Sequence, residues 1–252
     1  AFNRLQQAHG VNYNPDSPPF DIGLRRFYGP ISCLYWDWLR ILVCSGGVLQ
    51  YVINQVALDI ERSGVSLTRL DEHMSAFVSD NKARFACKAS GFFSSRINRK
   101  TDKKHHCTGF GSEMITVMCF LANFAKRVLD RNGVLPGQSR CVQTGYRILH
   151  ILQSGNTAVS KVDELRDLFC RLHDEIDISY GLEVQKVKAH LMHHVADCLE
   201  KSQMELNTFS CERRNKLLSL VSNHFVAAGN RESNLSLLHC KLFLHLEDML
   251  RS

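Results

Sequence analysis

The fold is decided by LYWDWLRILVCSGGVLQYVINQVALDI, residues 34–60. Apolar residues recur in this stretch at steps of three and four, which is the period of a helix with one buried face. Ser45-Gly46-Gly47 interrupts the pattern, and paired glycines are typical of a helix boundary or a tight packing point. The stretch therefore predicts a helix, a break and a second helix.

The same helical period recurs along most of the remaining chain, whereas strand-like alternation is limited to a weak case at Leu206 to Ser210. Further amphipathic segments are Ser66 to Phe77, Gly111 to Leu129, Cys141 to Gln153, Val159 to Tyr180, Val184 to Leu199, Cys211 to Phe225 and Leu235 to Leu250. Residues 1–30 hold four of the five prolines and are expected to form an irregular lead-in. We predict a mainly α, irregular multi-helix domain over residues 31–252.

Composition bounds the class of protein. With 252 residues and 44% hydrophobic content, the chain can build a real core. The ten cysteines are spread singly from Cys33 to Cys240, which favours reduced thiols and a nuclear or cytoplasmic location. No window approaches eighteen uninterrupted apolar residues, so we expect no membrane span. The chain starts at Ala1 without a signal segment or an initiating Met, which we interpret as a cut from something longer.

Charge gives a mild preference for polyanions, because 31 Lys and Arg residues face 25 Asp and Glu residues for a net +6. Residues 80–108 concentrate the cations and interleave them with Phe85, Phe92 and Phe93. Such a stretch can follow a phosphate backbone while a ring stacks on a base. A solvated basic loop between helices is the alternative. The cations singled out as nucleic-acid ligands are Arg96, Arg99, Lys100, Lys103 and Lys104.

Two positions outside that stretch could carry chemistry. Asp37 stands among large aromatic residues, and Arg40 one helical turn later offers it a local ion pair; a helix N-cap role is equally open. His190 and His194 lie at i and i+4, a spacing that can chelate a transition metal. The segment lacks the glutamate of a His-Glu-x-x-His motif, so packed or hydrogen-bonded histidines are the alternative.

Three segments together resemble the catalytic region of CACTA (En/Spm-like) DNA transposases: Asp37-Trp-Leu-Arg40, then Lys188-x-His190-x-x-His193-His194, then Cys211-Glu212-Arg213-x-x-Lys216. The resemblance runs from about Asn12 to Asn223. It implies an RNase H-like fold carrying a helical insertion, with room for a few short strands. Residues 31–180 would be the insertion-like helices, and residues 181–252 the C-terminal helices that carry the closing glutamate.

The resemblance also implies site residues. Asp37 would be the second acid and Glu212 the closing glutamate of an Asp-Asp-Glu triad that holds Mg²⁺ in an active relative. The first aspartate would precede residue 1, and Arg40 replaces the family's motif histidine. Arg213 and Lys216 would join the DNA-binding cations, although Glu212 at a helix start with Lys216 at i+4 also suits local stability.

We therefore expect a catalytically incomplete transposase-derived protein that binds DNA, a protein partner or a second copy of itself. A helical protein-interaction module with no nucleic-acid role is the alternative. The two readings differ in chemistry at one testable point. Asp37 and Glu212 must approach within about 4 to 7 Å if they share a metal pair.

Overall fold

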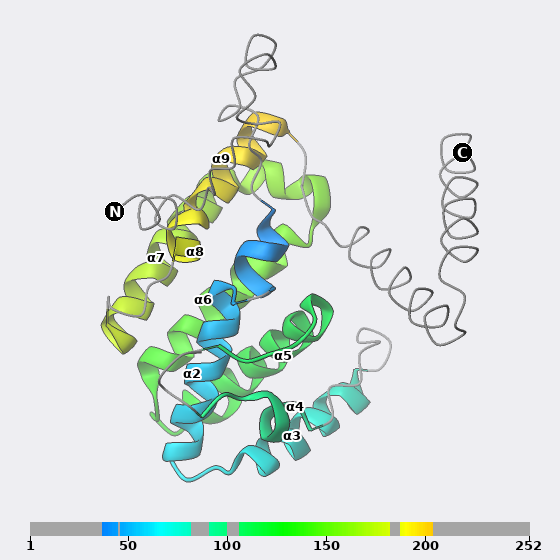
Figure 1. The fold of residues 1–252 in the computed structure, drawn as a ribbon, viewed down its shortest axis with the longest axis vertical. Coiled ribbons are helices and arrows are strands. Elements are labelled where there is room, and N and C mark those ends of the chain that lie inside the picture. The colour runs from blue at the N-terminus through cyan, green and yellow to red at the C-terminus, as the bar shows by residue number, and fades with distance from the viewer. Residues whose placement is uncertain (1–36, 45, 82–90, 100–105, 182–186, 204–252) are drawn as a thin grey trace, which may run out of the picture. The chain divides into compact units, whose positions relative to one another are not determined.

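The computed structural model describes residues 37–203 apart from residues 45, 82–90, 100–105 and 182–186. The chain divides into two compact units, Ala1–Asn207 and Thr208–Ser252, and all described residues belong to the first. Every regular element in these ranges is helical, which confirms the predicted mainly α class (Figure 1). The elements are η3 Leu39–Val43, α2 Val48–Arg62, α3 Leu67–Asp80, α4 Phe92–Arg96, α5 Gly111–Phe124, η4 Ala125–Leu129, α6 Pro136–Leu152, η5 Gly155–Lys161, α7 Val162–Tyr180, α8 Val187–Leu191 and α9 His193–Ser202.

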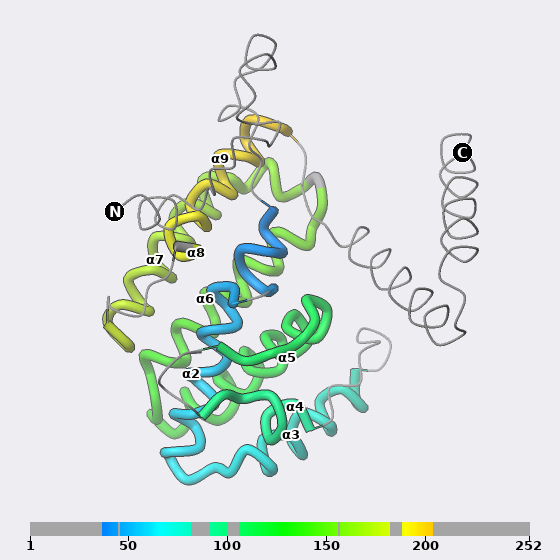
Figure 2. Tube along the Cα trace, viewed as in Figure 1, coloured from blue at the N-terminus to red at the C-terminus, as the bar shows by residue number. Residues whose placement is uncertain are grey.

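The stretch that was expected to decide the fold supplies the centre of this unit. α2 packs against η3, α5 and α6, and its residues Val52, Ile53, Ala57 and Ile60 are fully buried. The predicted break before α2 is real: Gly46 adopts a left-handed backbone with φ of 79°, which few other residues tolerate. In Figure 2 the short η3 turn leads through this break into α2.

The segment Leu39–Arg62 is also, by length and composition only, apolar enough to cross a membrane. It spans 24 residues with a mean hydropathy of 1.6. However, 88% of the apolar window is buried inside the protein, as it is in the core helix of a folded domain. This is weak support for a membrane span.

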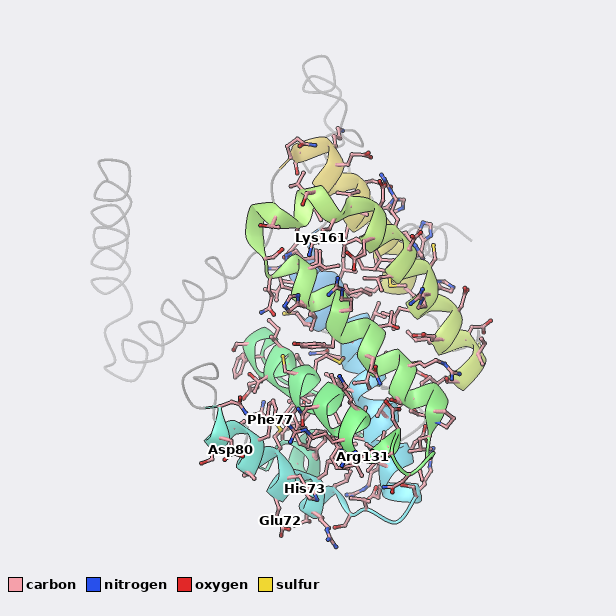
Figure 3. All side chains as sticks on the ribbon, turned by 180° about the vertical axis from the view of Figure 1, so that it is seen from behind. Glu72, His73, Phe77, Asp80, Arg131 and Lys161 are labelled. Atoms are coloured by element: carbon pink, nitrogen blue, oxygen red, sulfur yellow. The ribbon has the colours of Figure 1, made fainter. Side chains whose placement is uncertain are left out.

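The α3–α4–α5 corner is held by aromatic packing and by a buried cap. The Phe77 ring lies 5.8 Å from that of Phe120, and Phe93 lies 5.7 Å from the same ring. Figure 3 shows Phe77 beside α5 and Glu72 at the outer edge of α3. From α3, the buried Asp71 carboxylate accepts hydrogen bonds from the Phe93 and Ser94 amides at 2.7 and 2.9 Å. It thereby caps the first turn of α4.

The later helices form a second packed group in the same unit. α6 packs along α7, α7 packs against α9, and α8 contacts η3. α8 and α9 are separated only by Met192, so the predicted segment from Val184 to Leu199 is two short helices. The contact between α7 and α9 joins elements on the two sides of residue 180.

Candidate functional site

Asp37 binds local partners. One carboxylate oxygen accepts a hydrogen bond from the Leu39 amide at 3.0 Å, and the other lies 3.7 Å from Nε of Arg40. The Asp37 side chain is 17% exposed, whereas that of Arg40 is 60% exposed. This arrangement matches the alternative that the sequence left open, a helix-start cap with an adjacent ion pair.

The segment Lys188 to His194 contacts the segment Asp37 to Arg40. Nζ of Lys188 donates hydrogen bonds to the carbonyl oxygens of Arg40 at 2.6 Å and Cys44 at 2.9 Å. A cation at the carboxyl end of a helical turn is favoured, because unpaired carbonyls concentrate negative charge there. The fold thus brings Asp37-Trp-Leu-Arg40 and the histidine-rich segment together, although 144 residues separate Lys188 from Cys44.

The remaining acid of the proposed triad, Glu212, lies outside the described residues, as do Arg213 and Lys216. The distance from Asp37 to Glu212 therefore stays a prediction. Within the described residues, no group of three or more histidine, cysteine, aspartate or glutamate side chains is arranged to hold a metal ion.

Two arginines of the basic stretch at residues 80–108 form ion pairs within the protein. Arg96 forms an ion pair with Glu113, whose side chain is only 9% exposed, and its guanidinium lies 5.9 Å from the centre of the Phe92 ring. Arg99 pairs with Glu61 at 2.7 Å on a more open surface. Both cations therefore have carboxylate partners, while Lys100, Lys103 and Lys104 lie outside the described residues.

A pocket between α6 and α7 was not anticipated from the sequence. Its volume is about 270 Å³, and three of its lining side chains are arginines. It is lined by Arg140, Gln143, Thr144, Arg147, Leu168, Arg171 and Glu175. A signal did exist, because Arg140 and Arg147 are seven residues apart and therefore share one face of a helix. Periodicity alone could not show that α7 would add Arg171 to that face.

Glu175 is the acidic member of this pocket. Burial raises the pKa of its carboxyl group, and a hydrogen bond from Thr144 together with Arg171 and Arg140 opposes the shift. One of its buried carboxylate oxygens has no hydrogen-bond partner. Arg147 is paired with Glu164 at 2.7 Å across the same two helices. The pocket thus combines three cations with one acid whose charge is disfavoured, an environment suited to an incoming anion.

Four histidines gather where α7 meets α8 and α9. Nε2 of His194 lies 3.3 Å from Nε2 of His190, and Nε2 of His193 lies 3.4 Å from Nδ1 of His173. Burial and then the neighbouring imidazoles lower the pKa of His193. Asp197 lies on the far side of His194, 3.7 Å from its Nδ1. The spacing of His190 and His194 inferred from the sequence therefore places both rings on one face.

The described cysteines are free thiols, in agreement with the expectation of reduced side chains. Cys107, part of the His105-His106-Cys107 run, is fully buried and donates to the Gln50 carbonyl oxygen at 3.3 Å. Burial raises its pKa to about 12. Since a metal needs the thiolate form, this cysteine is a poor ligand where it lies.

Comparisons with protein-family models, curated proteins and solved structures give no significant match for this chain.

Proposed function

We propose that this chain is a transposase-derived protein that binds DNA and is catalytically incomplete. Its resemblance to CACTA transposases rests on three segments. The observation that carries the proposal is the contact between two of them, in which Lys188 bridges to the carbonyl oxygens of Arg40 and Cys44. Segments that share a site in a transposase must meet in space, and these two do so across 144 residues of sequence.

A Mg²⁺ role does not fit the described residues. Two metal ions in phosphoryl transfer need several carboxylates that converge. The two carboxylate oxygens of Asp37 instead contact the Leu39 amide and the Arg40 guanidinium. Arg40 would compete with a metal ion for the negative charge of Asp37. We therefore expect no Mg²⁺-dependent nicking of DNA by the purified chain. Nicking that disappears in both Asp37→Ala and Glu212→Ala would overturn the claim of inactivity.

DNA binding is the activity that the described surface supports best. The pocket between α6 and α7 presents Arg140 and Arg171, and arginine forks suit phosphate oxygens, whereas the third arginine of the pocket, Arg147, is paired with Glu164. Arg96 and Arg99 remain proposed DNA ligands, and each would have to share its charge with the carboxylate that it pairs with. The proposed location is nuclear or cytoplasmic, and a partner subunit or a second copy could share the complex.

The test is fluorescence anisotropy with a labelled DNA duplex over a range of salt concentrations. Affinity should fall linearly on a logarithmic plot against salt, with a slope of about −0.9 for each phosphate contacted. Arg140→Glu combined with Arg171→Glu should weaken binding and flatten that slope. Lys126→Glu with Arg127→Glu, an equal charge change at exposed positions on η4, is the matched control.

The helical interaction module remains the competing function. It predicts no binding to the duplex even at low salt. If the wild-type chain fails to bind, or if the pocket and η4 variants lose affinity equally, the pocket is not a DNA site. The first outcome refutes DNA binding altogether, whereas the second refutes only its location.

A further inference from the structure

We propose that His190 and His194 form a binding site for a borderline divalent transition metal such as Zn²⁺. The inference does not depend on a DNA role. It starts from one distance, the 3.3 Å between the two Nε2 atoms. Two nitrogens bound to one tetrahedral zinc ion at about 2.05 Å lie about 3.3 Å apart, so the rings are already spaced for chelation.

The backbone explains how the two rings reach this spacing. His190 lies near the end of α8 and His194 in the first turn of α9, so the pair spans the break at Met192. Despite the break, the i, i+4 relation of a continuous helix is preserved, and the ring centres lie 5.0 Å apart at an interplanar angle of 86°. A bound ion would therefore tie α8 to α9 across their junction.

Asp197 lies on the side of His194 where metal-binding histidines commonly have an outer partner. Its carboxylate faces Nδ1 of His194 at 3.7 Å. A carboxylate on that side favours the tautomer that carries its hydrogen on Nδ1, which leaves the Nε2 lone pair for a metal. The same tautomer also allows Nε2 of His194 to accept a hydrogen bond from His190.

The chemistry of the pair selects the class of cation. Imidazole nitrogens suit Zn²⁺, Cu²⁺ and Ni²⁺, whereas Mg²⁺ and Ca²⁺ prefer oxygen ligands. His190 is exposed and the His194 side chain is 40% exposed, so water can complete the coordination. The nearby His173–His193 pair is more enclosed, because His193 packs against Phe169 on α7. The His190–His194 pair is therefore the more exposed of the two and the more accessible to dissolved metal.

The experiment is a calorimetric titration of the full chain with Zn²⁺ at neutral pH, in a Cys170→Ser background that removes an exposed competing thiol. His190→Gln with His194→Gln should abolish one binding event. Asp197→Asn should weaken that event about tenfold, as is usual for an outer-shell partner. His150→Gln, a change of an exposed histidine on α6, should leave it unchanged. Mg²⁺ should not compete.

A second measurement guards against misfolding of the double variant. Zn²⁺ should raise the Tm of the Cys170→Ser chain and of His150→Gln, but not that of the double variant, whose Tm without metal should match the parent. Equal Zn²⁺ binding by parent and double variant would overturn the proposal. Loss of the event in His173→Gln, with retention in the double variant, would do so as well, because it would move the site to the enclosed pair.

Discussion

Arg96 and Arg99 stand three residues apart, and the sequence offers both as DNA ligands, but their surroundings predict that only the loss of Arg96 lowers stability appreciably. The Arg96 side chain is 35% exposed and that of its partner Glu113 is 9% exposed. The Arg99 side chain is 59% exposed and that of Glu61 is 32% exposed. Removing a cation is costly only where the carboxylate left behind cannot be solvated.

The loss of stability expected for Arg96→Ala depends on the contacts that the Glu113 carboxylate retains. Loss of a partner from a fully buried ion pair costs about 3 to 5 kcal/mol. Glu113 retains a hydrogen bond from the Phe110 amide at 2.9 Å, and part of Arg96 is already hydrated. We therefore expect a loss of about 2 to 3 kcal/mol in the free energy of unfolding, including the contact with Phe92. Arg99→Ala should leave that free energy almost unchanged, since exposed pairs contribute little.

Urea unfolding followed by circular dichroism measures both variants, and a shifted midpoint with an unchanged slope would report stability alone. Adding Glu113→Gln to Arg96→Ala should recover much of the loss, because the amide oxygen can still accept from Phe110 and carries no charge. Equal midpoints for Arg96→Ala and Arg99→Ala would refute the reasoning. If Arg96→Ala were as stable as the wild type but bound DNA more weakly, Arg96 would be a DNA ligand and not a structural cation.

Three further predictions test other contacts. Lys188→Met should lower the free energy of unfolding by about 1 to 2 kcal/mol, because charge-assisted bonds to two carbonyl oxygens are lost; thermal unfolding measures it, and an unchanged Tm contradicts it. A thiol reagent should modify exposed Cys170 in the native protein but buried Cys107 only on unfolding, since a pKa of about 12 leaves Cys107 about a thousandfold less thiolate than a cysteine with the ordinary pKa of 9.0; mass mapping of the modified residues decides. The raised pKa of Glu175 should make stability fall as pH rises from the usual carboxyl range through that pKa, and Glu175→Gln should remove this slope; urea midpoints across that range check it.

Local signals predicted the helix starts and breaks well. The segment predicted from Ser66 does begin there, because Ser66 caps α3 by accepting a hydrogen bond from the Arg69 amide at 3.2 Å. The break near Gly46, with φ of 79°, also lies where the paired glycines predicted it. The predicted start of α6 at Cys141 was wrong, because the helix begins at Pro136. Proline is common in the first turn of a helix, so the sequence did contain a signal for the correct start. The start of α3 and the break before α2 each depend on a few neighbouring residues, which is why the sequence reveals them.

The partners of the charged residues could not be predicted in the same way. Sequence shows that Arg96 is a cation, but only the fold shows that Glu113, 17 residues away, accepts its charge. The pocket arginines come from two helices whose relative placement no periodicity specifies. Asp37 is the exception, because its partners are two and three residues away. A local pattern was therefore enough to foresee both Arg40 and the cap.

The local satisfaction of Asp37 and the long-range contact of Lys188 bear differently on a transposase origin. The contact between the two segments can persist after catalytic activity is lost, because it stabilises the fold by itself. Lys188 donates hydrogen bonds to carbonyl oxygens at the C-terminal end of η3 whether or not a metal site exists. A catalytic aspartate, by contrast, needs its oxygens available to cations, and an adjacent arginine reduces that availability. The Lys188 contact is thus compatible with the proposed origin, whereas the pairing of Asp37 with Arg40 argues against catalysis.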